Sequence, residues 1–517
     1  MRPIALGNKA FIVLCLIALI GIVIALYSNS TLGVGISPDS VDYISTGENL
    51  LAGHGFVKFD GEPFVLWPPL FPSLLAIFGA FGLNLLVAAR FMNALAFGAI
   101  IILSGLVYFR LVKSIGLALI GALIVLVSLP LLEVTIFAWT EPIFVVLELL
   151  AIHQVLSFLE HPRRGHLIWT LVFASLCCLT RYIGVAVVLV CAAIIFDLFT
   201  PRERGRRLLA SAGYVFMALL PVMAWCGRNR LLTGTLTGER GLSVDPWLAR
   251  GSDALRTMGS WFVPYRVPPP VVFLFLLSGA GVFLLLQMWR QSNEKQRGSD
   301  VLRRGVALLV LFLFCYMALL IITLQSGVLV EGISNRFLAP VFPIVVGLVL
   351  VTVENMHKWI LSRFASTTWV GRIGIVVICC WLVLPISRAV AFVKEHRLHG
   401  AGGYTTVQWR SSPILVEIGR LHDETPIVSN ASTALYALAG ISSRPLPFKN
   451  EGTSHLRREI EKSESIYYVH FKPGIYWTTS NARINMLLSL DDLAREFRIT
   501  EIISAEDGTL FRIELPL

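Results

Sequence analysis

The sequence predicts a polytopic α-helical membrane domain of about eleven spans, followed by a small water-soluble α/β domain. Three observations support this fold class. Hydrophobic residues make up 56% of the 517 residues, with a mean hydropathy of +0.73. Only 15% of the residues are charged, against about 25% in soluble domains. The charge is also uneven, because residues 394–517 carry 14 Lys or Arg and 15 Asp or Glu, which is ordinary soluble composition. A soluble enzyme, a nucleic-acid-binding protein and a disordered protein are thereby excluded.

The membrane domain is expected over residues 1–390, because this part contains the apolar runs of spanning length, about 17–25 residues each. The runs lie near 10–27, 85–109, 115–132, 141–159, 166–181, 182–199, 208–225, 269–289, 305–325, 339–354 and 372–390. A further apolar run at 68–82 is too short to cross as a helix at about 1.5 Å per residue. We expect it to form a juxtamembrane or re-entrant helix within a long first outer loop, residues 28–84.

The basic residues predict the orientation, since Lys and Arg collect in short cytoplasmic loops. With a cytoplasmic N-terminus, the inner segments hold eighteen Lys or Arg and only five Asp or Glu. The net charge of +10 is therefore an orientation signal and not a signal of nucleic-acid binding. All eight Cys lie in or beside apolar runs, so no disulfide framework or thiolate metal site is indicated.

The tail, residues 391–517, is expected to form the extracytoplasmic α/β domain. Its pattern predicts a strand at 425–430, a helix at 431–440 ended by Gly440, a buried strand at 465–471, a helix at 490–497, and a hairpin around 506–508.

The first outer loop contains a predicted helix from Pro38 to Leu51, with Ser37 as its N-cap. Helical spacing places Asp39, Asp42, Tyr43 and Thr46 on one face of that helix. Two carboxylates are thereby held at the outer mouth of the membrane domain, although Asp39 could simply complement the helix N-terminus.

Further charged residues, with polar neighbours, stand at the outer ends of predicted spans. They are Glu141 in WTEP, Arg181 beside Tyr182 in LTRYIG, Arg228 and Asn229 in WCGRNR, and Arg336 in SNRF. Singly, each could be an interfacial anchor. Together they place carboxylates and guanidiniums at one depth on one side, where arginines of this kind would bind an anionic phosphate.

In their order along residues 10–345, these motifs resemble the GT-C superfamily of glycosyltransferases. The similarity is greatest to the branch with the protein O-mannosyltransferases and the lipid A aminoarabinose transferases. The resemblance rests on Asp39 with Tyr43, on GENLLAGHGF and WPPLFPSLL, and on Thr140-Glu141, Thr180-Arg181 and Trp225 with Arg228-Asn229. Many relatives have Asp-Glu or Asp-Asp in the first loop, whereas this chain has Asp39-Ser40 with Asp42 following.

The resemblance implies inverting sugar transfer from a polyprenyl-phosphate donor to an acceptor hydroxyl on the outer face of a bacterial inner membrane. The acceptor would be a protein, a lipid or a polysaccharide. Asp39, or else Asp42, would act as general base, and Glu141 would orient an arginine or bind sugar hydroxyls. The implied substrate-binding residues are Tyr43, Arg181, Tyr182, Arg228, Asn229 and Arg336, with the arginines stabilising the departing phosphate. That role makes a metal unnecessary, but Asp39, Asp42 and Glu141 could share a divalent cation, as in the oligosaccharyltransferase branch.

Two other interpretations remain open at this point. One is a transporter or flippase of a lipid-linked saccharide, and the other is a scaffold of a polysaccharide assembly complex. A transporter would be expected to show more charge within its spans and some repeat symmetry. This sequence has few such residues, chiefly Arg90, Glu148 and His153, and no internal repeat. The concentration of charge at one face therefore favours an enzyme.

Overall fold

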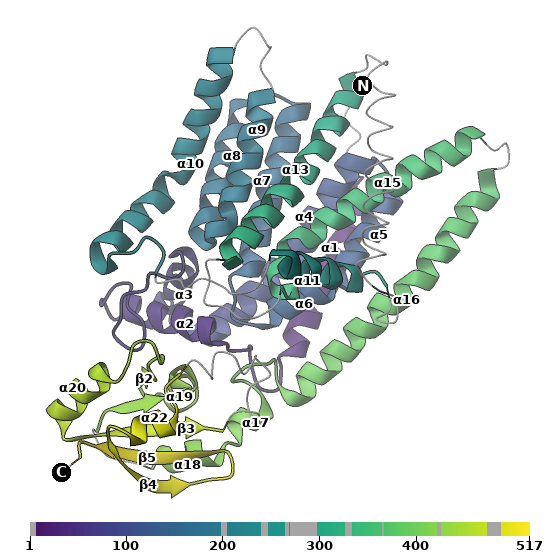
Figure 1. The fold of residues 1–517 in the computed structure, drawn as a ribbon. Helices are drawn as coiled ribbons and strands as arrows, with labels where there is room; N and C mark the ends of the chain where they lie inside the picture. The colour runs from purple at the N-terminus through teal and green to yellow at the C-terminus, as the bar shows by residue number, and fades with distance from the viewer. Residues whose placement is uncertain are drawn as a thin grey trace.

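The computed structural model describes residues 7–197, 204–238, 247–263, 268, 297–325, 333–363, 367–420, 425–472 and 487–516. These residues form a bundle of apolar helices with a small five-stranded sheet domain at one end (Figure 1). The N-terminus lies at the end of the bundle away from the sheet domain, and the C-terminus lies within that domain (Figure 1). The predicted fold class, a helical membrane domain followed by a small α/β domain, is confirmed.

Within the described ranges, seven helices are long and apolar enough to cross a membrane. They are α1 (Asn8–Ser28), α4 (Leu85–Val112), α7 (Glu141–Glu160), α10 (Arg204–Thr233), α13 (Arg297–Gln325), α15 (Phe342–Arg363) and α16 (Thr367–His399). The short α14 (Asn335–Leu338) and η3 (Ala339–Val341) lead directly into α15. Each of the seven helices coincides with a predicted span. Multiple crossings of a membrane are therefore built into the bundle.

The remaining apolar segments are shorter or bent. The predicted span at 115–132 is a pair of helices, α5 (Ile115–Leu126) and α6 (Leu129–Ile136), that meet at 49° and could count as an eighth crossing. The predicted spans at 166–181 and 182–199 correspond to α8 (Arg164–Thr180) and α9 (Val185–Asp197), which are apolar but shorter. The predicted span at 269–289 lies outside the described residues.

The turn between α8 and α9 includes the 3-10 helix η1 (Tyr182–Gly184) and depends on a glycine. A Cβ atom at Gly184 would lie 2.5 Å from the backbone of Cys177, so a larger residue there would push the two helices apart. This tight turn fixes the direction in which Arg181, the residue directly before η1, leaves the end of α8.

Two short helices lie between the bundle and the sheet domain, α2 (Pro38–Leu51) and α3 (Leu70–Ala80) (Figure 1). The bounds of α2 agree with the prediction. A capping box explains its start, because the Ser37 side chain accepts from the Ser40 amide while the Ser40 hydroxyl accepts from the Ser37 amide. The apolar run at 68–82 forms α3, which packs against α2 and α4 as a non-spanning helix.

The sheet domain has the strand order β2-β1-β3-β5-β4. Its strands are β1 (Ile427–Ser429), β2 (Arg444–Pro445), β3 (Ser465–Phe471), β4 (Arg498–Ser504) and β5 (Gly508–Glu514). Its helices are α17 (Val407–Arg410), α18 (Pro413–Ile418), α19 (Ser432–Ala439), α20 (Ser454–Ser463) and α22 (Leu490–Ala494). β1 pairs in parallel with β2 and β3, whereas β5 pairs antiparallel with β3 and β4. The predicted strands, the α19 helix and the final hairpin are confirmed, while α20 was not predicted.

Alternate residues of β3 enter two different cores, as expected for a strand buried on both sides. Val469 and Phe471 pack into a core that also contains Ile36 and Val41 from the start of α2. Ile466 belongs to a second core on the other face of the sheet. The domain therefore shares a hydrophobic core with the segment that carries Asp39. The predicted domain boundary at residue 390 stays a prediction, since α16 continues through it to His399.

Candidate functional site

The predicted carboxylates Asp39 and Glu141 are brought together because the segments preceding their helices run side by side. Gly35 and Phe137 form a parallel bridge. The Gly35 amide donates at 2.8 Å to the carbonyl of the residue before Phe137, and its carbonyl accepts at 2.9 Å from the residue after it. Four residues beyond the bridge in each segment stands an acid, Asp39 in the first turn of α2 and Glu141 in the first turn of α7. Two helix starts therefore present a carboxylate each at one place.

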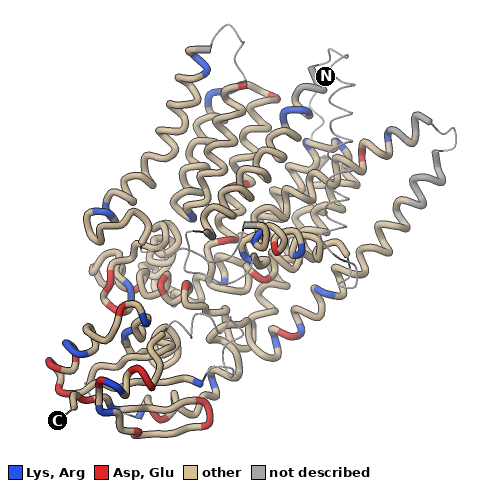
Figure 2. The backbone as a smooth tube through the Cα atoms, in the orientation of Figure 1, with Lys and Arg blue, Asp and Glu red and all other residues tan. Residues whose placement is uncertain are grey.

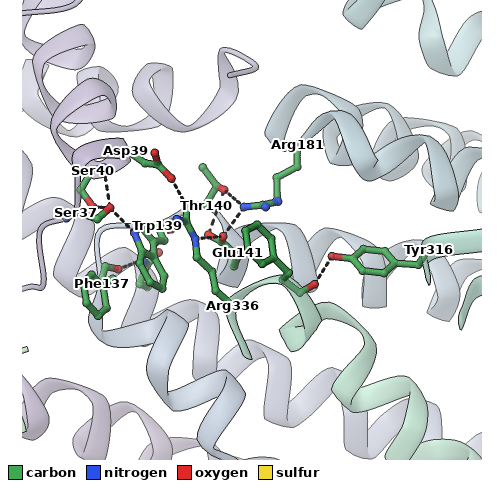
Figure 3. A network of polar contacts seen from close by, with 12 residues as sticks. Ser37, Asp39, Ser40, Phe137, Trp139, Thr140, Glu141, Arg181, Tyr316 and Arg336 are labelled. Atoms are coloured by element: carbon green, nitrogen blue, oxygen red, sulfur yellow. Dashed lines mark hydrogen bonds and ion pairs between the residues drawn. The ribbon is translucent and has the colours of Figure 1, made fainter. Parts of the chain in front are cut away.

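Two arginines join these carboxylates in what we call the Glu141 network, consisting of Asp39, Glu141, Arg181 and Arg336. Arg336 Nη2 lies 2.6 Å from Asp39 Oδ2, and Arg336 Nε lies 2.7 Å from Glu141 Oε1. Arg181 Nη1 lies 2.5 Å from the same Glu141 oxygen. Figure 3 shows Arg336 between the two acids, with Arg181 approaching Glu141 from another side. Two positive and two negative charges are thus balanced in one small network.

The balance matters because Glu141 is fully buried, with 0% of its side chain exposed. An isolated buried carboxylate would cost several kcal/mol. Arg181 also donates to the Thr140 hydroxyl at 3.1 Å, so its guanidinium is held by two neighbouring residues at the start of α7. The charges at this site are therefore fixed in position before any ligand arrives.

Trp139 contacts the Glu141 network through Arg336 and was not among the residues selected from the sequence. Its indole Nε1 donates to Ser37 Oγ at 2.7 Å, which ties it to the N-cap of α2. The Arg336 guanidinium lies 4.1 Å from its ring centre, an electrostatically favourable position for a cation. Phe137 stacks on its other side at 4.1 Å. The signal in the sequence was an aromatic residue directly before Thr140-Glu141.

Tyr43 lies one turn after Asp39 on the same face of α2, and its side chain is buried against Phe71 and Trp67. Burial, followed by the negative charge of Asp39, raises the pKa of Tyr43 well above its ordinary value. The phenol therefore stays protonated and offers an uncharged hydroxyl beside the Glu141 network.

Asp42 has a different electrostatic partner from Asp39, although both lie on α2. Burial lowers the pKa of Lys58, but the charges of Asp42 and Asp60 outweigh it and raise that pKa above its ordinary value. Lys58 Nζ also forms an ion pair with Asp60 at 2.8 Å. Asp42 thus belongs with the charges of the first loop, whereas Asp39 contacts Arg336. Of the two carboxylates that the sequence left open, Asp39 is the one that forms an ion pair with Arg336.

The other predicted residues form a neighbouring set, the Arg228 group, consisting of Tyr182, Arg228 and Asn229. Arg228 donates to the backbone carbonyls of Phe64 at 3.1 Å and Phe56 at 3.2 Å, and its guanidinium lies 4.5 Å from the Trp225 ring centre. Its donors are therefore directed at the backbone of the first loop.

Asn229 and Tyr182 hold the same loop. The buried Asn229 amide donates to the Val65 carbonyl at 3.3 Å and to the Leu236 carbonyl at 3.1 Å. The Tyr182 hydroxyl donates to the Val65 carbonyl at 3.2 Å. Since Arg181 and Tyr182 are adjacent in the chain, the Arg228 group and the Glu141 network are neighbours with different partners.

A shared divalent cation does not fit this arrangement. Asp39 and Glu141 are both engaged by arginine nitrogens, and Asp42 is coupled to Lys58. Over the described ranges, no three His, Cys, Asp or Glu side chains are grouped so that they could hold a metal ion. Among the described residues, the cations paired with Asp39 and Glu141 are the guanidiniums of Arg181 and Arg336.

The fold of this chain is similar to that of two solved membrane proteins, ArnT and AglB, both of the GT-C class that the sequence motifs resemble. A solved structure of ArnT from Cupriavidus metallidurans in the apo state superposes with a TM-score of 0.59 at 12% identity, covering 96% of this chain and 97% of that one. ArnT from the same organism bound to undecaprenyl phosphate gives 0.52 at 15% identity, over 98% of both chains.

A second kind of GT-C protein is also similar. The archaeal oligosaccharyltransferase AglB from Archaeoglobus fulgidus, in complex with an inhibitory peptide and a dolichol-phosphate, gives a TM-score of 0.51 at 12% identity. The match covers 88% of this chain and 69% of AglB. No family model and no curated sequence matches the chain. The likeness is thus one of fold, and it extends over nearly the whole chain for ArnT.

Proposed function

We propose that this protein is a membrane glycosyltransferase that moves a sugar, with inversion, from a polyprenyl-phosphate donor to an acceptor hydroxyl. Two observations of the comparison proteins support the donor class. The ArnT structure holds undecaprenyl phosphate, and the AglB structure holds a dolichol-phosphate. The acceptor is a hydroxyl of a protein, lipid or polysaccharide, and AglB with its bound peptide supports the first of these.

The observation that carries the proposal is the Glu141 network, because it puts a carboxylate and two guanidiniums at one place. Asp39 is held through Oδ2 by Arg336. The second carboxylate oxygen of Asp39 would take the proton of the acceptor hydroxyl. At the same time, the hydroxyl oxygen would attack the anomeric carbon of the sugar. The bond from that carbon to the phosphate oxygen breaks, and polyprenyl phosphate leaves with the electron pair.

The leaving phosphate gains negative charge in this step, and pre-positioned cations stabilise such charge most effectively. Arg336 and Arg181 are held by Glu141, so they need no reorganisation during the reaction. The protonated Tyr43 hydroxyl would bind a sugar or phosphate oxygen next to them. Arg228, Asn229 and Tyr182 would contribute to substrate binding indirectly, by holding the first loop through its Phe64 and Val65 carbonyls.

We further propose that the site faces the outside of a bacterial inner membrane, with the N-terminus in the cytoplasm. The charge pattern supports this. Lys and Arg recur at the helix ends farthest from the sheet domain, whereas that domain carries both signs (Figure 2). Under the positive-inside rule the end of the bundle farthest from the sheet domain is cytoplasmic. The Glu141 network and the sheet domain then lie outside.

The test uses membranes that contain the full chain, supplied with labelled polyprenyl-phosphate sugars. The wild type should move label into an acceptor fraction, and Asp39→Asn should lower the rate by about 10²–10⁴-fold, the range for a positioned general base. Asp60→Asn is the matched control, because Asp60 lies in the same outer loop but pairs with Lys58.

Three results would contradict the proposal. Normal transfer by both Asp39→Asn and Asp42→Asn would remove the assigned base. Movement of labelled lipid across the bilayer without transfer would identify a flippase. Full function after removal of both Arg181 and Arg336 would indicate a scaffold.

A further inference from the structure

The linker between α16 and the sheet domain, residues 400–404, runs beside the segment that begins α2. Ile36 and Gly403 form a parallel bridge, and the Tyr404 amide donates to the Ile36 carbonyl at 2.8 Å. The Thr405 hydroxyl donates to the Val34 carbonyl, also at 2.8 Å. Residues 34–36 are therefore hydrogen-bonded on one side to the two neighbours of Phe137 and on the other to Tyr404 and Thr405. We call this arrangement the three-segment junction (Gly35–Ile36, Phe137 and Gly403).

Two glycines allow the linker to approach so closely. A Cβ atom at Gly403 would lie 2.0 Å from the Ile36 carbonyl oxygen, and one at Gly402 would lie 2.5 Å from Phe137 Cζ. Both residues also have positive φ angles, 58° and 110°, which side chains disfavour. Any other residue at Gly403 would force the linker away from Ile36, and any other residue at Gly402 would collide with the Phe137 ring.

The three-segment junction controls both acids of the Glu141 network. Ser37, the N-cap of α2, follows Ile36 directly, and Asp39 is three residues from Ile36. On the other side, Phe137 precedes Glu141 by four residues and stacks on Trp139. A shift of the linker would be transmitted through the Ile36 backbone to the ion pair of Asp39.

We propose that Gly402 and Gly403 are positioning residues, through which the C-terminal domain holds Asp39 at its place against Arg336. The inference rests on the proposed glycosyl transfer. It gives the C-terminal domain a task in catalysis, because a displacement of about 1 Å in a reacting group can cost about 10²-fold in rate. The linker itself contacts no substrate.

The test compares Gly403→Ala with Gly440→Ala in the full chain. Gly440 lies in the same domain with φ 68°, but a Cβ atom there meets nothing within 4 Å. The two variants share the backbone strain and differ in the collision with Ile36. We expect Gly403→Ala to lower kcat by about 10²-fold with an unchanged KM for the lipid donor. Gly440→Ala should retain the wild-type kcat, and Gly402→Ala provides a second variant of the linker.

Hydrogen exchange of the peptide covering residues 34–46 gives a readout that is independent of activity. Exchange should be faster in Gly403→Ala than in the wild type and unchanged in Gly440→Ala. A wild-type kcat in folded Gly403→Ala would overturn the inference, as would an equal loss of kcat in Gly440→Ala. If the wild type transfers no sugar, the proposed function fails by itself. Unchanged exchange in both linker variants would then overturn the junction separately.

Discussion

The Glu141 network and the Arg228 group lie side by side, but their arginines are bound in opposite ways. Arg336 and Arg181 are bound by carboxylates. Their guanidiniums are the groups that could also meet an anionic ligand. Arg228 donates to two backbone carbonyls of the first loop, which fixes the course of that loop. The difference teaches that arginines at the same end of a bundle divide by their partners into those paired with carboxylates and those bonded to the backbone.

The largest effect on stability is expected from removing the charge at the centre of the network. Glu141→Gln would remove the negative charge that Arg181 and Arg336 share in a buried site. Breaking a buried ion pair from one side costs about 3–5 kcal/mol. Thermal unfolding in detergent and the transfer assay should both show a large loss. Unchanged stability would mean that the network is solvated and the comparison is wrong.

A smaller loss is expected from Arg336→Lys, which keeps the charge but not the planar fork that reaches Asp39 and Glu141 together. One charged hydrogen bond is worth about 1.5–3 kcal/mol, so kcat should fall by about 10- to 100-fold. Steady-state kinetics with the labelled donor measure this. A wild-type kcat would show that either contact of Arg336 suffices.

The Arg228 group should respond in the other way. Arg228→Met leaves the Phe56 and Phe64 carbonyls without their donor, which costs about 1–3 kcal/mol of stability. The kcat of the folded fraction should stay near that of the wild type, because no carboxylate of the network is touched. A drop in kcat as large as that of Arg336→Lys would move Arg228 into the chemistry and remove the distinction.

The smallest effect is expected at the contact between the sheet domain and α2, where the Tyr436 hydroxyl donates to Glu48 at 2.5 Å. The pair is partly exposed, so Tyr436→Phe should cost less than about 1 kcal/mol. Burial, followed by the bond to Glu48, raises the pKa of Tyr436. Any stabilisation is therefore present below the ordinary tyrosine pKa of about 10 and is lost as pH rises above it. Melting curves of wild type and Tyr436→Phe should converge at that alkaline end, and a gap that widens there would contradict this.

Most of the secondary structure was readable because hydrophobic length, caps and turns act locally. The helix from Pro38 to Leu51 and the end of α19 at Gly440 follow from a capping residue and a glycine with φ 68°. The predicted span at 115–132 is a pair of helices, and composition does not reveal the 49° bend between α5 and α6. The α20 helix was missed because its residues are mainly polar and charged.

The candidate site was readable as a set of residues but not as a set of contacts. Asp39, Glu141, Arg181, Arg228 and Arg336 could all be selected, since charges at the ends of apolar spans stand out. The separation of Arg228 from the other two arginines could not be foreseen, because it depends on where the first loop returns. For the same reason Trp139 was passed over, although it touches both Ser37 and Arg336.

The sequence by itself determined the membrane character, the positions of most helices, the composition of the C-terminal domain and the side of the bundle on which charge collects. These properties follow from local composition and from the cost of burying unpaired polar groups. Only the tertiary structure decided that Asp39 rather than Asp42 meets Arg336 and that a glycine linker touches the start of α2. Such contacts join residues more than a hundred positions apart, so their geometry depends on the packing of the whole chain and on no single segment.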